Sequence, residues 1–179
     1  MNPRLPASTR RRAAWACAAL LCVRAATAAG LEQLPQDWRD DLDQPLVLSH
    51  LVGHRVILSM AYVSCHNTCP ATLNELRRMQ QVLDRRGEQA SFVIVGYDAD
   101  NDDPQSWHQY RLNHGLDRAN WHFLTGTSTT VRRLARELGF EFWSYDTHVM
   151  HGSRVVFFDS KGQYSGAVSP ATGNWAALL

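Results

Sequence analysis

Residues 55–83 have the sequence RVILSMAYVSCHNTCPATLNELRRMQQVL, in which an apolar run leads through two cysteines into a helical pattern. The run at residues 55–63 is almost unbroken in apolar side chains, which is typical of a strand covered on both faces. After Pro70, apolar residues recur at helical spacing until Gly87, namely at Leu73, Leu76, Met79, Val82 and Leu83. The segment therefore predicts a buried strand, a turn that carries Cys65 and Cys69, and a long amphipathic helix.

Strands and helices continue to alternate along the rest of the chain. Asp102-Asp103-Pro104 predicts a helix start, with an aspartate as the N-cap and proline at the first helical position. A third helix is predicted to end at Gly139. Further strands are predicted at residues 90–97, 121–124, 155–158 and 163–167, the last two as a hairpin around a glycine-containing turn. This order indicates an α/β fold with a central mixed sheet flanked by helices and a C-terminal β-hairpin.

The first 28 residues have the composition of a targeting segment. They carry five arginines and no acidic residue, and an apolar stretch at residues 13–23 is followed by small residues. This pattern predicts a signal peptide, with an uncleaved N-terminal membrane anchor as the alternative. Because the apolar stretch is about half as long as a bilayer-spanning helix, cleavage is the favoured interpretation. We expect a periplasmic or otherwise extracytoplasmic protein, either secreted or anchored to the inner membrane.

The remaining chain has the composition of one globular domain. Residues 29–45 are polar and contain two prolines, which predicts an extended lead-in before a domain at residues 46–179. Residues 29–179 carry 13 of the 18 Lys and Arg and all 17 Asp and Glu, so their net charge is negative. This charge, without a basic stripe, argues against nucleic acid as a partner. We expect a monomer.

Cys65 and Cys69 are the two cysteines outside the targeting segment. One closely spaced pair is not a disulfide scaffold. The pair follows a buried strand and precedes a helix, and such turns at the carboxyl edge of an open sheet often carry the chemistry of α/β proteins. Backbone N–H groups at a helix start favour thiolates. The residues themselves leave three alternatives open: a soft metal site, a redox couple, or an inert structural disulfide.

Four motifs, in order, resemble those of the Sco/SenC family, the copper proteins of cytochrome oxidase assembly. The segment SCHNTCPATL (residues 64–73) resembles the family's C-x3-C-P motif. The segment VGYDADNDDP (residues 95–104) is similar to its aspartate-rich D-P-x-x-D-x-P loop, with Ala99 in place of the usual proline. The segment WHFLTG (residues 121–126) matches an aromatic-x-x-Leu-Thr-Gly strand and turn, and residues 145–162 resemble the stretch with the third copper ligand.

The resemblance implies a thioredoxin-like copper-binding domain at residues 46–179. Its closing helix is short or missing, because only residues 169–179 follow the predicted hairpin. By the same resemblance, Cu(I) or Cu(II) is held by Cys65, Cys69 and His151. Two thiolates and one imidazole suit copper, whereas a closed structural zinc site takes four protein ligands.

His148 is the main competitor for the role of third ligand. In the family the ligand is followed at once by a strand and an Asp/Gly turn, and His151 has that relation to residues 155–162. His148 is not directly followed by a predicted strand. His66, between the cysteines, is a further alternative as an extra ligand. The prediction therefore favours His151.

Two functions are compatible with this ligand set. The first is a chaperone that supplies copper to cytochrome c oxidase, with an oxidase subunit or another copper or thiol protein as the partner. The alternative is an enzyme, a thiol-disulfide oxidoreductase that uses Cys65 and Cys69 as its catalytic pair to keep partner cysteines reduced. The nearby aspartates are predicted to lie in a solvated loop with a helix N-cap, or to form a docking patch, and to bind no copper: Asp98, Asp100, Asp102 and Asp103.

Overall fold

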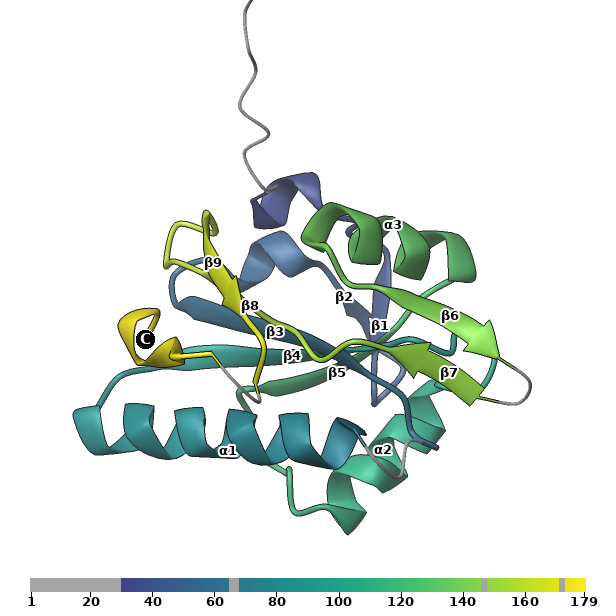
Figure 1. Cartoon of the computed structure of the whole chain (residues 1–179), viewed down its shortest axis with the longest axis horizontal. Helices are drawn as coiled ribbons and strands as arrows, with labels where there is room; N and C mark the ends of the chain where they lie inside the picture. The colour runs from purple at the N-terminus through teal and green to yellow at the C-terminus, as the bar shows by residue number, and fades with distance from the viewer. Residues whose placement is uncertain (1–29, 65–67, 146–147, 171–172) are drawn as a thin grey trace, which may run out of the picture.

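A seven-stranded mixed sheet in the order β2-β1-β5-β4-β3-β8-β9 forms the centre of the computed structural model (Figure 1). The structure describes residues 30–64, 68–145, 148–170 and 173–179. The predicted targeting segment, residues 1–28, lies outside these ranges. The strands are β1 (Trp38–Asp40), β2 (Pro45–Leu46), β3 (Arg55–Ala61), β4 (Ala90–Gly96), β5 (Trp121–Thr125), β8 (Val155–Phe158) and β9 (Tyr164–Val168).

The central strands confirm the predicted apolar runs. β3 pairs in parallel with β4, and β4 pairs in parallel with β5, so the three carboxyl ends lie at one edge of the sheet. β8 runs antiparallel to β3 and leads into β9, which confirms the C-terminal hairpin. Every residue of β4 and β8 is buried, because helices and 3-10 turns cover both faces of the sheet.

Three helices flank the sheet, with α1 (Thr68–Arg86) and α2 (Pro104–Asn113) on one side and α3 (Ser128–Leu138) on the other (Figure 1). α1 begins two residues before Pro70, the predicted start. The predicted N-cap of α2 is Asp103, whose carboxylate accepts a hydrogen bond from the Ser106 amide at 2.7 Å. Gly139 ends α3 with a φ of 70°, as a left-handed cap requires. No helix within the described ranges is long and apolar enough to cross a membrane.

Residues 30–45 differ from the extended lead-in predicted for residues 29–45. They include a 3-10 helix, η1 (Leu31–Gln33), followed by β1 and β2. β1 pairs antiparallel with β5, and Trp38 is only 2% exposed. The ring of Trp38 packs so closely on Gly126 that a Cβ there would lie 2.8 Å from it. The sheet therefore begins earlier than predicted, because Leu31, Leu34 and Trp38 are buried and anchor a segment that is otherwise largely polar.

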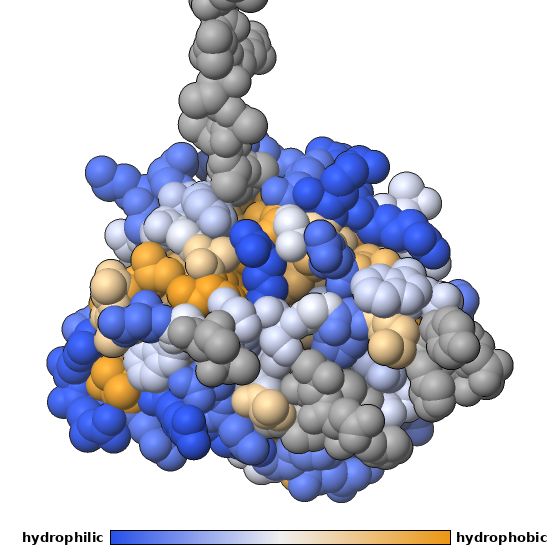
Figure 2. All heavy atoms as spheres, in the orientation of Figure 1, coloured by the Kyte–Doolittle hydropathy of each residue, from blue (hydrophilic) through white to orange (hydrophobic). Residues whose placement is uncertain are grey.

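The chain after β9 confirms the prediction of a short closing element. Its helical content within the described residues is one 3-10 turn, η3 (Trp175–Ala177). The indole of Trp175 donates a hydrogen bond to Glu75 of α1 at 2.5 Å. Apolar residues remain at the surface around β9, whereas the surface over α1 is largely hydrophilic (Figure 2).

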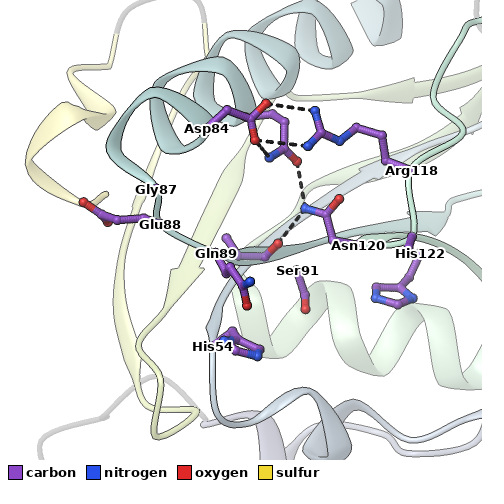
Figure 3. Close-up of a pocket in the computed structure, with 12 residues that line it drawn as sticks. His54, Asp84, Gly87, Glu88, Gln89, Ser91, Arg118, Asn120 and His122 are labelled. Atoms are coloured by element: carbon purple, nitrogen blue, oxygen red, sulfur yellow. Dashed lines mark hydrogen bonds and ion pairs between the residues drawn. The ribbon is translucent and has the colours of Figure 1, made fainter.

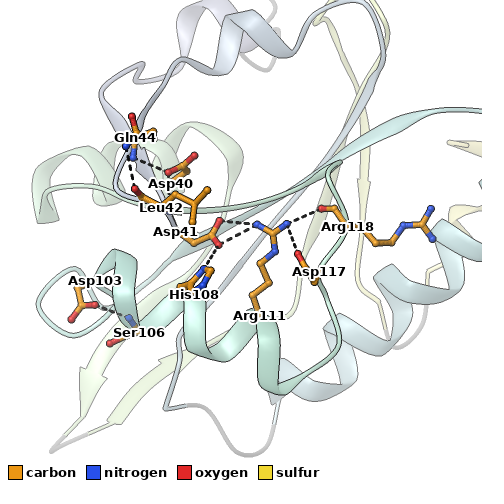
Figure 4. A network of polar contacts seen from close by, with 10 residues as sticks. All are labelled: Asp40, Asp41, Leu42, Gln44, Asp103, Ser106, His108, Arg111, Asp117 and Arg118. Carbon is orange, nitrogen blue, oxygen red and sulfur yellow. Dashed lines mark hydrogen bonds and ion pairs between the residues drawn. The ribbon is translucent and has the colours of Figure 1, made fainter.

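A network of ionic contacts fixes the sheet edge to α2 (Figure 4). Asp41, in the turn between β1 and β2, has a side chain that is only 3% exposed. Its two carboxylate oxygens lie 3.0 and 3.1 Å from the same guanidinium nitrogen of Arg111, and His108 Nδ1 lies 3.2 Å from one of them. Removing this carboxylate would leave a largely buried guanidinium without its main partner, which is costly.

We predict that Asp41→Asn lowers the free energy of unfolding by about 2 kcal/mol, because a charge-assisted bond to Arg111 is lost. The matched control is Asp43→Asn, which breaks the exposed pair with Arg39 and should change stability by less than about 0.5 kcal/mol. Urea denaturation measures both. Equal values for the two variants would contradict the structural role of Asp41.

Candidate metal centre

The two predicted cysteine ligands lie at the β3–α1 connection. Cys65 is outside the described residues, and Cys69 lies in the first turn of α1 with its side chain outside the described part. The assignment of both as ligands therefore stays a prediction. Among the residues that are described, no cluster of three His, Cys, Asp or Glu could hold a metal ion.

His151 lies at the carboxyl edge of the sheet, beside the start of the cysteine-bearing turn. Its ring packs edge-on against Tyr62, with the ring centres 5.6 Å apart, and is tilted over Tyr97 at 4.6 Å. Tyr62 directly follows β3 and precedes Cys65 by three residues, and Tyr97 directly follows β4. The predicted third ligand is thus in contact with the ends of the two central strands.

The orientation of the imidazole of His151 suits a ligand role. Its Nδ1 lies 3.0 Å from the carbonyl oxygen of Gly152, and because a carbonyl only accepts, Nδ1 carries the proton. Metal-binding histidines commonly use one ring nitrogen for the metal and the other for such a hydrogen bond.

A second hairpin, which the sequence did not predict, presents this histidine. It consists of β6 (Phe142–Tyr145) and β7 (His148–His151), which form a separate two-stranded sheet. Phe142 is the register partner of His151 and packs on Tyr97 at 4.9 Å between ring centres. Trp143 and Met150 pair on the other face and are 57% and 45% exposed. The alternation orients His151 toward the sheet edge.

The prediction that His148 lies outside a strand is wrong, because β7 begins at this residue. The choice of His151 over His148 as a ligand stays a prediction. The side chain of His148 is outside the described part. The hairpin could have been predicted from the aromatic residues within 142–145 and the β-branched Val149, because such residues are enriched in strands.

At this edge of the sheet, the environment of Asp102 differs from the prediction. Its side chain is fully buried, with 0% exposure, and does not lie in solvent as predicted. Its two carboxylate oxygens accept hydrogen bonds from the amide of Val63 at 2.9 Å and the amide of Asp98 at 2.8 Å. Asp103 is the helix N-cap and is exposed. Asp102 therefore joins the segment after β3 to the loop after β4.

Burial raises the pKa of Asp102 to about 7, although the two backbone amides favour the charged carboxylate. The negative charges of Asp98 and Asp103 raise the pKa further. The cost of desolvating the carboxylate therefore exceeds the gain from its hydrogen bonds.

A cavity of about 610 Å³ lies at the other end of the strands, away from His151 (Figure 3). Arg118 and Asp84 form an ion pair in its wall, with N–O distances of 2.9 and 3.0 Å. Asn120 donates to Gln80 at 2.8 Å and to the carbonyl of Ala90 at 2.7 Å. These polar groups bond to one another, and their contacts join α1 to the starts of β4 and β5.

The fold and this edge define a thioredoxin-like α/β domain in which a histidine lies beside a cysteine-bearing strand-to-helix turn. The family model described as SCO1/SenC matches residues 36–178. The chain belongs to the SCO1/SenC family.

Two relatives are similar in sequence. A protein of Stutzerimonas stutzeri whose name describes it as copper-binding is 30% identical over 135 residues, which cover 72% of this chain and 65% of that protein. The SCO1 protein homolog of Bacillus subtilis is 26% identical over 81 residues, covering 45% of this chain and 42% of that protein. The matches thus cover less than two thirds of either relative.

Solved structures confirm the thioredoxin-like fold. Arabidopsis thaliana ScoI with copper bound superposes with a TM-score of 0.70 at 18% identity, covering 80% of this chain and 90% of that one. Yeast Sco1 superposes with a TM-score of 0.68 at 17% identity, covering 82% and 90%.

The titration of Asp102 leads to a prediction about stability. The pKa of about 7 in the folded chain exceeds the ordinary value of 3.8, so folding favours the protonated form. The contribution of this group to stability is therefore complete below a pH of about 4 and is lost as the pH rises toward 7. The excess stability of the native chain over Asp102→Asn should fall across this interval, as measured by urea denaturation at several pH values.

The control is Asp100→Asn, a change at an exposed residue of the same loop. It should show the same pH dependence as the native chain. Parallel stability curves for the native chain and Asp102→Asn would show that Asp102 does not titrate in this interval.

Proposed function

We propose that this protein binds one copper ion through Cys65, Cys69 and His151. The observation that carries the proposal is the packing of the His151 ring on Tyr62, three residues before Cys65. Cys69 lies in the first turn of α1, at the other end of the same connection. The ring thus lies beside the start of the connection that carries both cysteines, which supports a shared site for the three side chains.

The donor set suits copper. Two thiolates are soft ligands that favour Cu(I), and the added imidazole also supports Cu(II). The amide groups at the start of α1 favour the thiolate form of cysteines in this turn. His151 Nδ1 donates to the carbonyl of Gly152, an outer hydrogen bond of the kind that metal-binding histidines commonly make.

We propose further that the protein is an extracytoplasmic chaperone that assists assembly of the copper site of cytochrome c oxidase. Family membership and the copper-binding relative support the copper function. A solved neighbour with a TM-score of 0.71 is named a SCO1/SenC family lipoprotein, and the arginine-rich N-terminal pattern agrees with export. The proposed recipient is an oxidase subunit or another copper or thiol protein outside the cytoplasm.

The copper assignment predicts that Cys65→Ser and Cys69→Ser each abolish tight Cu(I) binding and the thiolate-to-copper charge-transfer band. His151→Ala should weaken binding by at least about 10-fold, because one of three ligands is lost. Competition with a chromogenic Cu(I) chelator, together with absorption spectra of the Cu(II) form, measures these effects.

The matched control is His148→Ala, at the other end of β7. It should change copper affinity by less than about 3-fold, within the ordinary context dependence of such contributions. The reverse result would assign the imidazole ligand to His148. Native copper stoichiometry in Cys65→Ser would refute the site as a whole.

A further prediction separates copper delivery from thiol reduction. A disulfide cycle requires the two cysteines but no ring nitrogen, whereas tight copper binding requires the imidazole. His151→Ala should therefore keep a reducible Cys65–Cys69 disulfide and fail to restore oxidase copper content in a strain that lacks the protein. Full restoration by this variant would show that thiol reduction is the physiological activity.

A further inference from the structure

The carboxylate of Asp102 joins two backbone segments at the edge that carries the proposed copper site. One oxygen accepts from the amide of Val63, two residues before Cys65. The other accepts from the amide of Asp98, at the start of the loop after β4. The amide of Asp102 itself donates to the carbonyl of Asp98 at 2.7 Å, so the carboxylate is held within a closed turn.

These two amides lie just beyond the last regular contact between the strands. The amide of Tyr97 donates to the carbonyl of Ala61 at 2.8 Å, which is the end of the β3–β4 pairing. Beyond this point no ladder bond between β3 and β4 is present in the described residues, and Asp102 supplies the connection. The carboxylate therefore extends the order of the sheet toward the cysteine-bearing turn.

The same two segments form the surface on which His151 packs. Tyr62 is the neighbour of Val63, and Tyr97 is the neighbour of Asp98. The ring of His151 contacts both tyrosines. A displacement of either backbone segment would therefore change the position of the histidine as well as the direction in which the chain leads to Cys65.

We propose that Asp102 is the positioning residue of the copper site, whose single side chain fixes both the segment that leads to Cys65 and the segments that bear the two tyrosines on which His151 packs. The inference rests on the proposed function. Asp102 contributes no copper ligand, because both of its oxygens are directed to backbone amides. It acts through Val63 and Asp98, as outer hydrogen-bond partners do in metal sites.

Gly96 provides the space that the Asp102 carboxylate occupies. A Cβ at this position would lie 2.7 Å from Cβ and 2.8 Å from Oδ2 of Asp102. Both distances are shorter than such contacts allow, so a side chain at residue 96 would displace the carboxylate. Gly96 does not have a positive φ, and an alanine there adds steric contact without backbone strain.

The first test is the Asp102→Asn variant of the full chain. Asparagine has one acceptor oxygen in place of two, so one of the two amides loses its bond. We expect copper affinity to fall by about 10-fold or more, with a shift of the thiolate-to-copper charge-transfer band. A residue that serves stability alone would leave that band in place once the protein is folded.

The matched control is Asp103→Asn, which makes the same change of charge at the adjacent residue. The carboxylate of Asp103 bonds to Ser106 of α2 and not to the segment before Cys65. It should leave the helix cap, copper affinity and the band nearly unchanged, because asparagine is as good an N-cap as aspartate. An equal loss of affinity in both variants would show that the effect is one of charge and would overturn the positioning role.

Gly96→Ala tests the same connection without any change of charge. It should reproduce the band shift and the loss of affinity, and the double variant Gly96→Ala/Asp102→Asn should be no weaker than the weaker single variant. Additive losses would show that the two residues act separately. Should Asp102→Asn fail to fold by circular dichroism, Gly96→Ala, which retains the carboxylate, provides the comparison with Asp103→Asn.

The outcomes distinguish this inference from the function on which it rests. A native chain that binds no copper, or binds it equally well as Cys65→Ser, refutes the copper site. Native affinity and spectrum in folded Asp102→Asn and Gly96→Ala refute the positioning role alone.

Discussion

The parallel pairing of β3 with β4 is the constraint on which the rest of the structure depends. Seven residue pairs, from Arg55 with Ala90 to Ala61 with Gly96, fix the register of the two strands. Because the two strands run in the same direction, both end at one edge of the sheet, and a tyrosine directly follows each of them. Tyr62 and Tyr97 are thereby placed beside each other, and they form the floor against which a residue from another part of the chain can pack.

That residue arrives on β7, which is not part of the main sheet. The β6–β7 hairpin lies between α3 and β8 in sequence and pairs only with itself within the described residues. Its position relative to the sheet edge therefore depends on side-chain packing, namely that of Phe142 and His151 on Tyr97. A side chain held in this way can adjust its position more readily than one on a central strand, a property that suits the proposed copper-binding function.

The parts of this structure that the sequence predicted are those with strong local patterns. β3, β4 and α1 follow from apolar runs and helical periodicity, and the caps at Asp103 and Gly139 follow from backbone chemistry that operates within a few residues. The β6–β7 hairpin was missed despite a local signal, whereas two other errors concern contacts over long distances in the chain. β1 depends on the packing of Trp38 against Gly126, and the buried state of Asp102 depends on Val63, which is 39 residues away. Neither pairing leaves a periodic pattern in the sequence, and four aspartates within six residues suggest solvent exposure for all of them.

Asp102 also shows what a carboxyl group contributes at a place where its burial is unfavourable. Its raised pKa indicates that the buried carboxylate is disfavoured near neutral pH, so an apolar or amide side chain would avoid the cost. An apolar side chain, however, would leave two buried amides without acceptors, and an amide side chain would satisfy only one of them. A carboxyl group is the short side chain that offers two oxygens in different directions, one to each segment. The cost of burying the Asp102 carboxylate therefore falls at the edge where β3 and β4 separate. At this place two chain segments are held together without a strand ladder.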